Sequence, residues 1–310
     1  MKSAIIYYSQ TGNTEKIAKA IHTGMTQITG DCDFIKLGDA NPLRLYEYDL
    51  IGIGSPVFHF VEPPNVKAFI SNMRSVGGKH AFVFCTHCTH WFFEQSIIPR
   101  LKRRGLVIIG SADWYGCGNG PLMTPSPYFT DGHPDEIDLN EAEAFGKEMV
   151  IRSQKIYAGD MSLIPPDPEQ KPYPEWHKED FTEILNWPKM VKLNMEKCLY
   201  PACRLCVDNC PMKGIDLSVK PPIFASPCTS CHFCGQICPT GAIEIDTSRI
   251  QAASDLLSLR IREVFLDNLK SNEEKGHFRP HVRFEDVGYD TPLWKIYNGN
   301  PKWIIGKGRP

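Results

Sequence analysis

The chain has 310 residues, of which 42% are hydrophobic and 23% are charged, and its formal net charge is −2. This length suits about two globular domains, and no region has the basic excess expected of a nucleic-acid-binding surface. No apolar run approaches the roughly 20 residues that cross a membrane, and the first residues contain too short an apolar stretch for a signal peptide. We therefore expect a soluble, cytoplasmic protein with no nucleic-acid partner and no membrane span.

Five short apolar segments alternate with segments of helical spacing in the first half of the chain. The strands are expected at residues 2–8, 34–37, 49–54, 80–85 and 106–112, and the helices from Thr14 and at 66–73, 92–104 and 136–157. Parallel neighbouring strands need crossover connections, which these helices supply. The alternation therefore predicts an α/β domain over residues 1–158, built on a doubly wound parallel five-stranded sheet.

The second half of the chain has a different composition. Six prolines between residues 160 and 190 predict an extended linker over 159–190. A small cysteine-rich domain is expected over 191–250. The remaining residues, 251–310, are expected to form a C-terminal extension, with an amphipathic helix at 252–270 followed by an irregular tail rich in glycine and proline.

A hydroxyl-rich turn joins the first expected strand to the first expected helix. Such a turn presents backbone N–H groups and hydroxyls at a helix N-terminus, where the helix dipole favours an anion. The turn lacks the Gly-Lys-Ser/Thr of a nucleoside triphosphate site and the three-glycine fingerprint of a dinucleotide site. An ordinary helix cap would use the same residue types, but the pattern suits a phosphate monoester such as that of FMN. The residues concerned are Ser9, Gln10, Thr11, Gly12, Asn13 and Thr14.

The stretch Ile6–Thr14 resembles the flavodoxin signature in both spacing and chain position. The resemblance implies a five-stranded parallel sheet with FMN at the carboxyl ends of the strands. It also implies that two further loops hold the isoalloxazine ring. These are Ser55, Pro56, Val57, Phe58, His59 and Phe60 after the third strand, and Thr86, His87, Cys88, Thr89, His90 and Trp91 after the fourth. Phe58, His59 and Trp91 are candidates for ring contacts because aromatic faces stack on flavin, although core packing would equally explain Phe58 and Trp91.

Eight of the twelve cysteines lie between Cys198 and Cys238, in two quartets that are each followed by proline. The quartet Cys228, Cys231, Cys234 and Cys238 has the spacing of the bacterial ferredoxin run. The quartet Cys198, Cys203, Cys206 and Cys210 differs from it by two extra residues between the first two cysteines. Zinc sites also use Cys-x2-Cys pairs, but with a longer spacer between two pairs. We therefore expect two [4Fe–4S] clusters.

The ferredoxin resemblance implies a small α+β bicluster domain with crossed ligation, because the fourth cysteine of each run binds the other cluster. One cluster would then be held by Cys198, Cys203, Cys206 and Cys238, and the other by Cys228, Cys231, Cys234 and Cys210.

Four cysteines remain outside the quartets. Cys32 is expected to act as a small hydrophobic or surface residue, and Cys85 to be buried at a strand end. Cys88 and Cys117 fall on the expected flavin side. A third metal site built from Cys85, Cys88 and Cys117 would need a fourth ligand, which His59, His87 or His90 could supply. His133 is expected only in the loop and cap that precede the last helix of the first domain.

Residues 1–250 resemble the flavodoxin–ferredoxin fusion proteins. The resemblance implies an electron-transfer iron–sulfur flavoprotein that relays electrons between a redox partner protein, two [4Fe–4S] clusters and FMN, without a catalytic acid or base. The alternative is an enzyme, a ferredoxin-dependent flavin reductase that acts on a small organic substrate over FMN. Its candidate proton donors are His59, His87, Cys88 and Tyr128. A reductase subunit dedicated to one partner enzyme is a third hypothesis.

Overall fold

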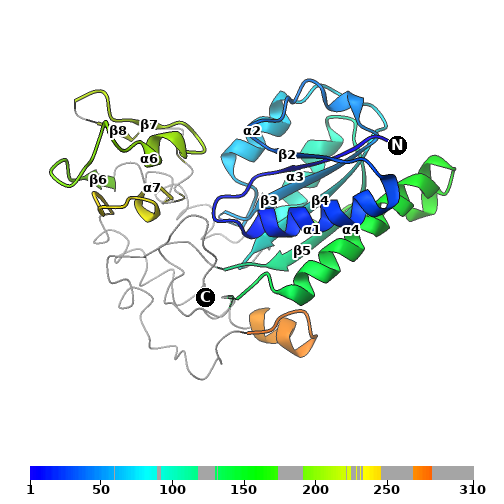
Figure 1. The fold of residues 1–310 in the computed structure, drawn as a ribbon. Helices are drawn as coiled ribbons and strands as arrows, with labels where there is room; N and C mark the ends of the chain where they lie inside the picture. Colours follow the sequence, from blue (N-terminus) through cyan, green and yellow to red (C-terminus); the bar gives the residue numbers. More distant parts are fainter. Residues whose placement is uncertain are drawn as a thin grey trace. The chain divides into compact units, whose positions relative to one another are not determined.

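The structure is a computed structural model, and it describes residues 1–58, 60–88, 92–117, 130, 132–173, 191–220, 222–224, 228, 231, 233–245 and 268–280. The chain divides into two compact units, residues 1–117 with 132–172, and residues 118–131 with 173–310. Figure 1 labels most of the helices and strands of both units. Within the described ranges, no helix has the length and apolar character needed to cross a membrane.

A five-stranded parallel sheet forms the centre of the first unit. Its order is β2-β1-β3-β4-β5, and every neighbouring pair is parallel. This order is that of a doubly wound, flavodoxin-like sheet, and it confirms the predicted fold class. The strands are β1 (Ser3–Tyr7), β2 (Asp33–Lys36), β3 (Leu50–Pro56), β4 (His80–His87) and β5 (Val107–Tyr115).

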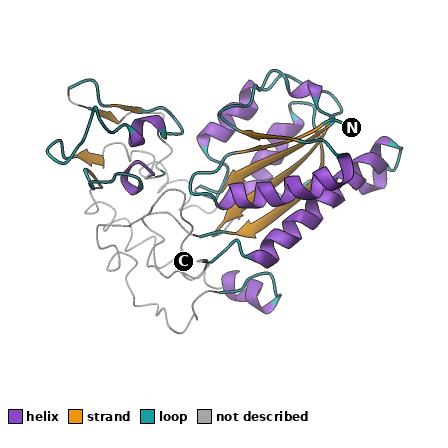
Figure 2. Cartoon of the chain, viewed as in Figure 1, coloured by secondary structure: helices purple, strands orange, loops and turns teal. Residues whose placement is uncertain are grey.

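Helices cover both faces of this sheet, as Figure 2 shows. Residues of α2 and α3, such as Val66 and Ile97, pack against one face, whereas residues of α1 and α4, such as Ile17 and Met149, pack against the other. Every residue of β1 and β4 is buried, as expected for parallel strands enclosed on two sides. The helices are α1 (Asn13–Thr29), α2 (Pro64–Asn72), α3 (Phe93–Lys102) and α4 (Glu136–Tyr157), with short 3-10 turns at Leu45–Glu47 and Met161–Leu163.

Two glycines allow α1 and α4 to approach each other closely. A Cβ atom on Gly24 would lie 1.9 Å from the carbonyl oxygen of Glu143, and one on Gly146 would lie 2.2 Å from that of Ile21. Both distances are far below a van der Waals contact, so the helix backbones meet where no larger side chain fits.

Two strands run further than the sequence predicts. Strand β4 continues past residue 85 to His87, and β5 continues past residue 112 to Tyr115. The apolar pattern ends earlier because exposed Ser111 and Asp113 interrupt it, while hydrogen bonding to β4 continues through Tyr115. The extension carries His87, Asp113 and Tyr115 to the carboxyl edge of the sheet.

The second unit contains short elements in its described part. Strand β6 (Val191–Leu193) pairs with β9 (Ile243–Ile245), and β7 (Ile215–Asp216) pairs with β8 (Ile223–Phe224), both antiparallel. Each cysteine quartet carries a one-turn helix, α6 (Leu205–Asp208) or α7 (Phe233–Gln236). The predicted helix at 252–270 and residues 174–190 of the predicted linker lie almost entirely outside the described residues.

Candidate functional site

The turn between β1 and α1 has the geometry of an anion site. Gly12 precedes the helix with φ 101° and ψ −16°, and no side chain caps the helix N-terminus. The Gly12 N–H donates to Ser9 Oγ at 3.2 Å. Gln10 Nε2 is buried, with no hydrogen-bond partner in the described part of the chain. Uncapped N–H groups and a buried amide donor together suit a phosphate group.

This turn is tied to the carboxyl ends of β4 and β5. The buried hydroxyl of Thr14 lies 2.7 Å from that of Thr86. Thr86 lies near the end of β4 and is the first residue of the second loop that is predicted to hold the isoalloxazine ring. Asn13 Nδ2 donates to the carbonyl oxygen of Cys117 at 3.1 Å. Side chains from the ends of β1 and β4 therefore meet here, and Thr14 and Thr86 both belong to loops that the flavodoxin resemblance assigns to FMN; that assignment stays a prediction.

The loop after β3 folds into a tight turn. The backbone groups of Phe58 and Val61 bond reciprocally at 2.9 and 3.1 Å, and Phe60 between them has φ 67°. A positive φ is costly for a bulky non-glycine residue and is often found at functional sites. Ser55 is buried at the strand end, Pro56, Val57 and Phe58 are half-buried, and Phe58 lies edge-on to the ring of Tyr8 at 6.4 Å. His59 is outside the described residues.

Thr86 and His87, which begin the predicted second ring loop, are the buried last residues of β4. The His87 Nε2 atom lies 2.8 Å from Asp113 Oδ2 on β5, and the His87 ring lies 4.9 Å from that of Tyr115. The half-buried Cys88 thiol donates to the Gly116 carbonyl oxygen at 3.6 Å. Thr89, His90, Trp91 and Tyr128 lie outside the described residues.

Cys85 is fully buried in the sheet, as predicted. Burial, with smaller contributions from the charges of Asp113 and Glu94, holds the pKa of its thiol well above the usual value. A thiol in this environment is a poor nucleophile and a poor metal ligand. The structure therefore favours a packing role for Cys85 over a share in a third metal site.

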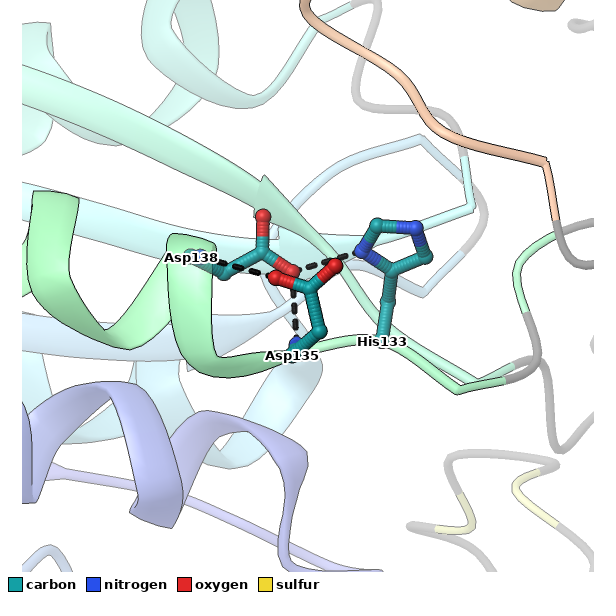
Figure 3. A group of neighbouring side chains, drawn as sticks. All are labelled: His133, Asp135 and Asp138. Atoms are coloured by element: carbon teal, nitrogen blue, oxygen red, sulfur yellow. Dashed lines mark hydrogen bonds and ion pairs between the residues drawn. The ribbon is translucent and has the colours of Figure 1, made fainter.

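A second His–Asp pair lies at the start of α4 (Figure 3). His133 Nδ1 lies 2.6 Å from Asp138 Oδ2, which also accepts the Asp135 N–H at 2.8 Å. Asp135 Oδ1 in turn accepts the N–H groups of Ile137 and Asp138, which completes a capping box. The three side chains could surround a cation, but both carboxylates already cap the helix. This confirms the predicted cap before the last helix.

The first predicted ligand set lies around one cavity of the second unit. Cys198, Cys203, Cys206 and Cys238 line it together with apolar residues that include Leu193, Leu205 and Leu217. Burial raises the pKa of Cys206 to about 11, and the neighbouring Cys238, Cys198 and Cys203 add to the rise. Mutual repulsion among four sulfurs is the environment in which a bound cationic metal centre stabilises thiolates.

Three members of the other set also lie near one another. Burial raises the pKa of Cys234, and Cys231 and Cys228 raise it further. The remaining member, Cys210, accepts the Gly214 N–H on its sulfur at 3.3 Å. Its assignment to this group stays a prediction.

Comparisons with known proteins cover both halves of the chain. Residues 4–98 match the family model of the flavodoxin domain. A ferredoxin of Methanothermococcus thermolithotrophicus is 35% identical over 57 residues, which are 18% of this chain and 95% of that protein. An uncharacterized ferredoxin of Methanocaldococcus jannaschii is 34% identical over 58 residues, again 18% of this chain and 94% of its own length. A flavodoxin of Clostridium beijerinckii is 26% identical over 148 residues, 47% of this chain and 96% of its own. The chain is a flavodoxin–ferredoxin fusion.

The flavodoxin half of the fusion contains a buried charge that sequence reasoning missed. Glu62, directly after the loop that follows β3, is fully buried, accepts a hydrogen bond from Ser96 Oγ at 3.1 Å and lies 3.0 Å from Arg100 Nε. Burial raises the pKa of Glu62, although the charges of Lys67 and Arg100 and the Ser96 hydrogen bond oppose the rise. These contacts attach the turn at Phe58–Val61 to α3.

The fusion also places Asp113, Tyr115 and Asp138 at the edge of the sheet where the predicted loops converge. The Tyr115 ring lies between the two His–Asp pairs, 4.9 Å from His87 and 6.3 Å from His133. For Asp138 a usable signal was present, because an acidic residue three positions after Asp135 is typical of a capping box. No local signal marks Asp113 or Tyr115, which reach the site only through the order of the strands.

Proposed function

We propose that this fusion is an electron-transfer iron–sulfur flavoprotein, with FMN at the carboxyl edge of the parallel sheet and two [4Fe–4S] clusters in the cysteine-rich unit. A redox partner protein would donate or accept the electrons. The observation that carries the proposal is the cavity lined by Cys198, Cys203, Cys206 and Cys238. These four residues match one complete crossed ligand set expected of a two-cluster ferredoxin, which supports the proposal.

The chain's own residues supply binding and positioning. The N–H groups at the start of α1, with Gly12, Asn13 and Thr14, would hold the phosphate, and the Thr14–Thr86 contact would fix this turn against β4. The segments at 55–60 and 86–91 would flank the ring. When bound, FMN carries one or two electrons and each cluster carries one, so the chain would interconvert the two kinds of electron transfer.

The direct test is anaerobic purification followed by metal, flavin and EPR analysis. We expect about eight iron atoms and one FMN per chain. Reduction should give the spectrum of two interacting clusters. A Cys198→Ser variant should lose one cluster, whereas Cys32→Ser, which changes a cysteine of the flavodoxin half, should keep both. Bound zinc in place of iron, or the absence of flavin absorbance after reconstitution with FMN, would overturn the proposal.

The two His–Asp pairs favour a second candidate, the ferredoxin-dependent flavin reductase. A reductase needs groups that hold and release protons beside its substrate, and a histidine paired with a carboxylate can do so. The carboxylate of Asp138 orients His133, and that of Asp113 orients His87. If the fusion is a reductase, small organic acceptors will reoxidise the reduced protein, and an Asp113→Asn variant will slow that reaction but not electron exchange with a ferredoxin. Equal effects on both reactions would exclude this candidate.

A further inference from the structure

Cys210 and Cys238, which are each expected to bind the cluster of the other cysteine run, have matching surroundings. Cys210 Sγ accepts the N–H of Gly214, and Cys238 Sγ accepts the N–H of Ala242, at 3.3 and 3.2 Å. In each case the donor is four residues after the cysteine, and the residue before it has a positive φ, 52° at Lys213 and 64° at Gly241. The two halves of the ferredoxin unit are therefore local repeats in backbone geometry.

One side chain breaks this repeat. Thr240, two residues after Cys238, has its Oγ1 atom 3.7 Å from Cys238 Sγ. The equivalent position after Cys210 is Met212, whose side chain has no hydroxyl to donate. Each of the two cysteines therefore has its own backbone N–H donor, and Cys238 has a hydroxyl donor in addition.

The donors change the electrostatics at Cys238. The Thr240 hydroxyl at 3.7 Å and the Ala242 N–H at 3.2 Å both lie within hydrogen-bonding distance of its sulfur. The same donors would stabilise negative charge on a ligating sulfur. Hydrogen bonds to cluster sulfurs raise the reduction potential, because the reduced cluster carries one more negative charge.

Lys213 is a charged residue that could offset this difference, since Gly241 takes its place in the other repeat. Its side chain is exposed, and an exposed ammonium group is screened by water and salt. Thr240 is exposed too, but its hydroxyl is within hydrogen-bonding distance of the ligand sulfur, so no solvent layer screens this interaction.

We propose that Thr240 makes the cluster bound by Cys198, Cys203, Cys206 and Cys238 the higher-potential cluster of the pair, so that a single electron entering the ferredoxin unit resides there. The proposal rests on the proposed function, because it needs two clusters with crossed ligation. The step adds one electron to one cluster, forms no bond and moves no proton. Thr240 is a positioning residue that acts through Cys238.

The test is an EPR-monitored redox titration of the full chain, with dithionite as the reductant. In the unmodified protein we expect two one-electron potentials. In Thr240→Val, which keeps the side-chain shape, the equilibrium constant for reducing the higher-potential cluster should fall about tenfold, equivalent to about 59 mV. The potential of the other cluster should stay unchanged. Thr240→Ser, which keeps a hydroxyl, should restore the gap, and Met212→Val is the matched control at the equivalent position.

A second variant covers the case in which Thr240→Val does not assemble its clusters. Met212→Thr adds a hydroxyl to the other repeat and should raise the lower potential, which also narrows the gap. Unchanged potentials in both variants, or a Thr240→Ser protein that behaves like Thr240→Val, would overturn the inference while leaving the proposed function intact. An unmodified protein without two clusters would overturn both.

Discussion

Replacement of Gly12 by alanine tests whether the turn before α1 is a phosphate site. Gly12 has φ 101°, and a Cβ atom built there meets no atom within 4 Å. The cost of the substitution is therefore backbone strain without a steric clash. A left-handed conformation costs an L-residue roughly 1–2 kcal/mol, and φ 101° lies well beyond the usual left-handed minimum near φ +57°. We expect Gly12→Ala to destabilise the protein by about 2 kcal/mol, a factor of about 30 in the unfolding equilibrium.

The same strain should weaken FMN binding. If the backbone relaxes toward a negative φ, the N–H groups at the start of α1 rotate away from the anion that they would bind. We expect the Kd for FMN to rise at least tenfold, measured by quenching of flavin fluorescence on titration of the apoprotein. The free energy of unfolding comes from urea denaturation of the same sample.

Alanine variants of two further glycines distinguish the effect of backbone strain on stability from the effect on FMN binding. Gly78 also has a positive φ, 77°, and open space around a built Cβ, but it precedes β4 at the opposite edge of the sheet. Gly78→Ala should lose similar stability and bind FMN normally. Gly38 has open space without a positive φ, so Gly38→Ala should change neither quantity appreciably. If Gly12→Ala binds FMN as tightly as Gly78→Ala does, this turn is not the phosphate site.

Three other predictions follow from buried groups. Gly146→Ala should destabilise the protein by about 1–3 kcal/mol through the clash with the Ile21 carbonyl oxygen; helix propensity alone predicts the opposite sign, so an increase in the thermal midpoint would contradict the packing. Because burial raises the pKa of Glu62 in the folded state, its favourable contribution is complete below the unfolded pKa and is lost as the pH rises through the folded pKa. As the pH rises from 4 to 8, the free energy of unfolding of Glu62→Gln, measured by urea denaturation, should therefore increase relative to that of the unmodified protein. A difference between the two proteins that stays constant over this range would refute the raised pKa of Glu62. Finally, alkylation of the native protein at pH 8 should spare Cys85, whose thiol is buried and has a raised pKa; modification of Cys85 before unfolding, detected by peptide mass spectrometry, would show that it is accessible.

The fold was predictable because its local signals agree with one another. Each strand contains a short apolar run, and the intervening helices have one apolar face. The spacing of Cys198, Cys203 and Cys206, with the crossed Cys238, predicted a group that lines one cavity. In each of these cases the relevant partners are close in sequence or obey a fixed spacing.

The rest of the site depends on contacts between distant parts of the chain. Asp113 meets His87 only because β5 lies beside β4, and Glu62 meets Arg100 only because α3 packs beside the loop after β3. Gly24 and Gly146 resemble poor helix residues in isolation, and their value becomes visible only when α1 and α4 are brought together. Periodicity carries no information about such pairs.

The hydrogen bond between the Cys117 N–H and the His133 carbonyl oxygen, 3.1 Å long, has a consequence for how the protein can change. It joins the two ends of the segment 118–132, so this segment leaves and re-enters the flavodoxin half at one point. The entropic cost of closing such a loop grows only with the logarithm of its length, about 0.6 kcal/mol for each doubling. Insertions between Cys117 and His133 should therefore cost the sheet little, and new recognition sequences could be grafted there without redesign of the fold.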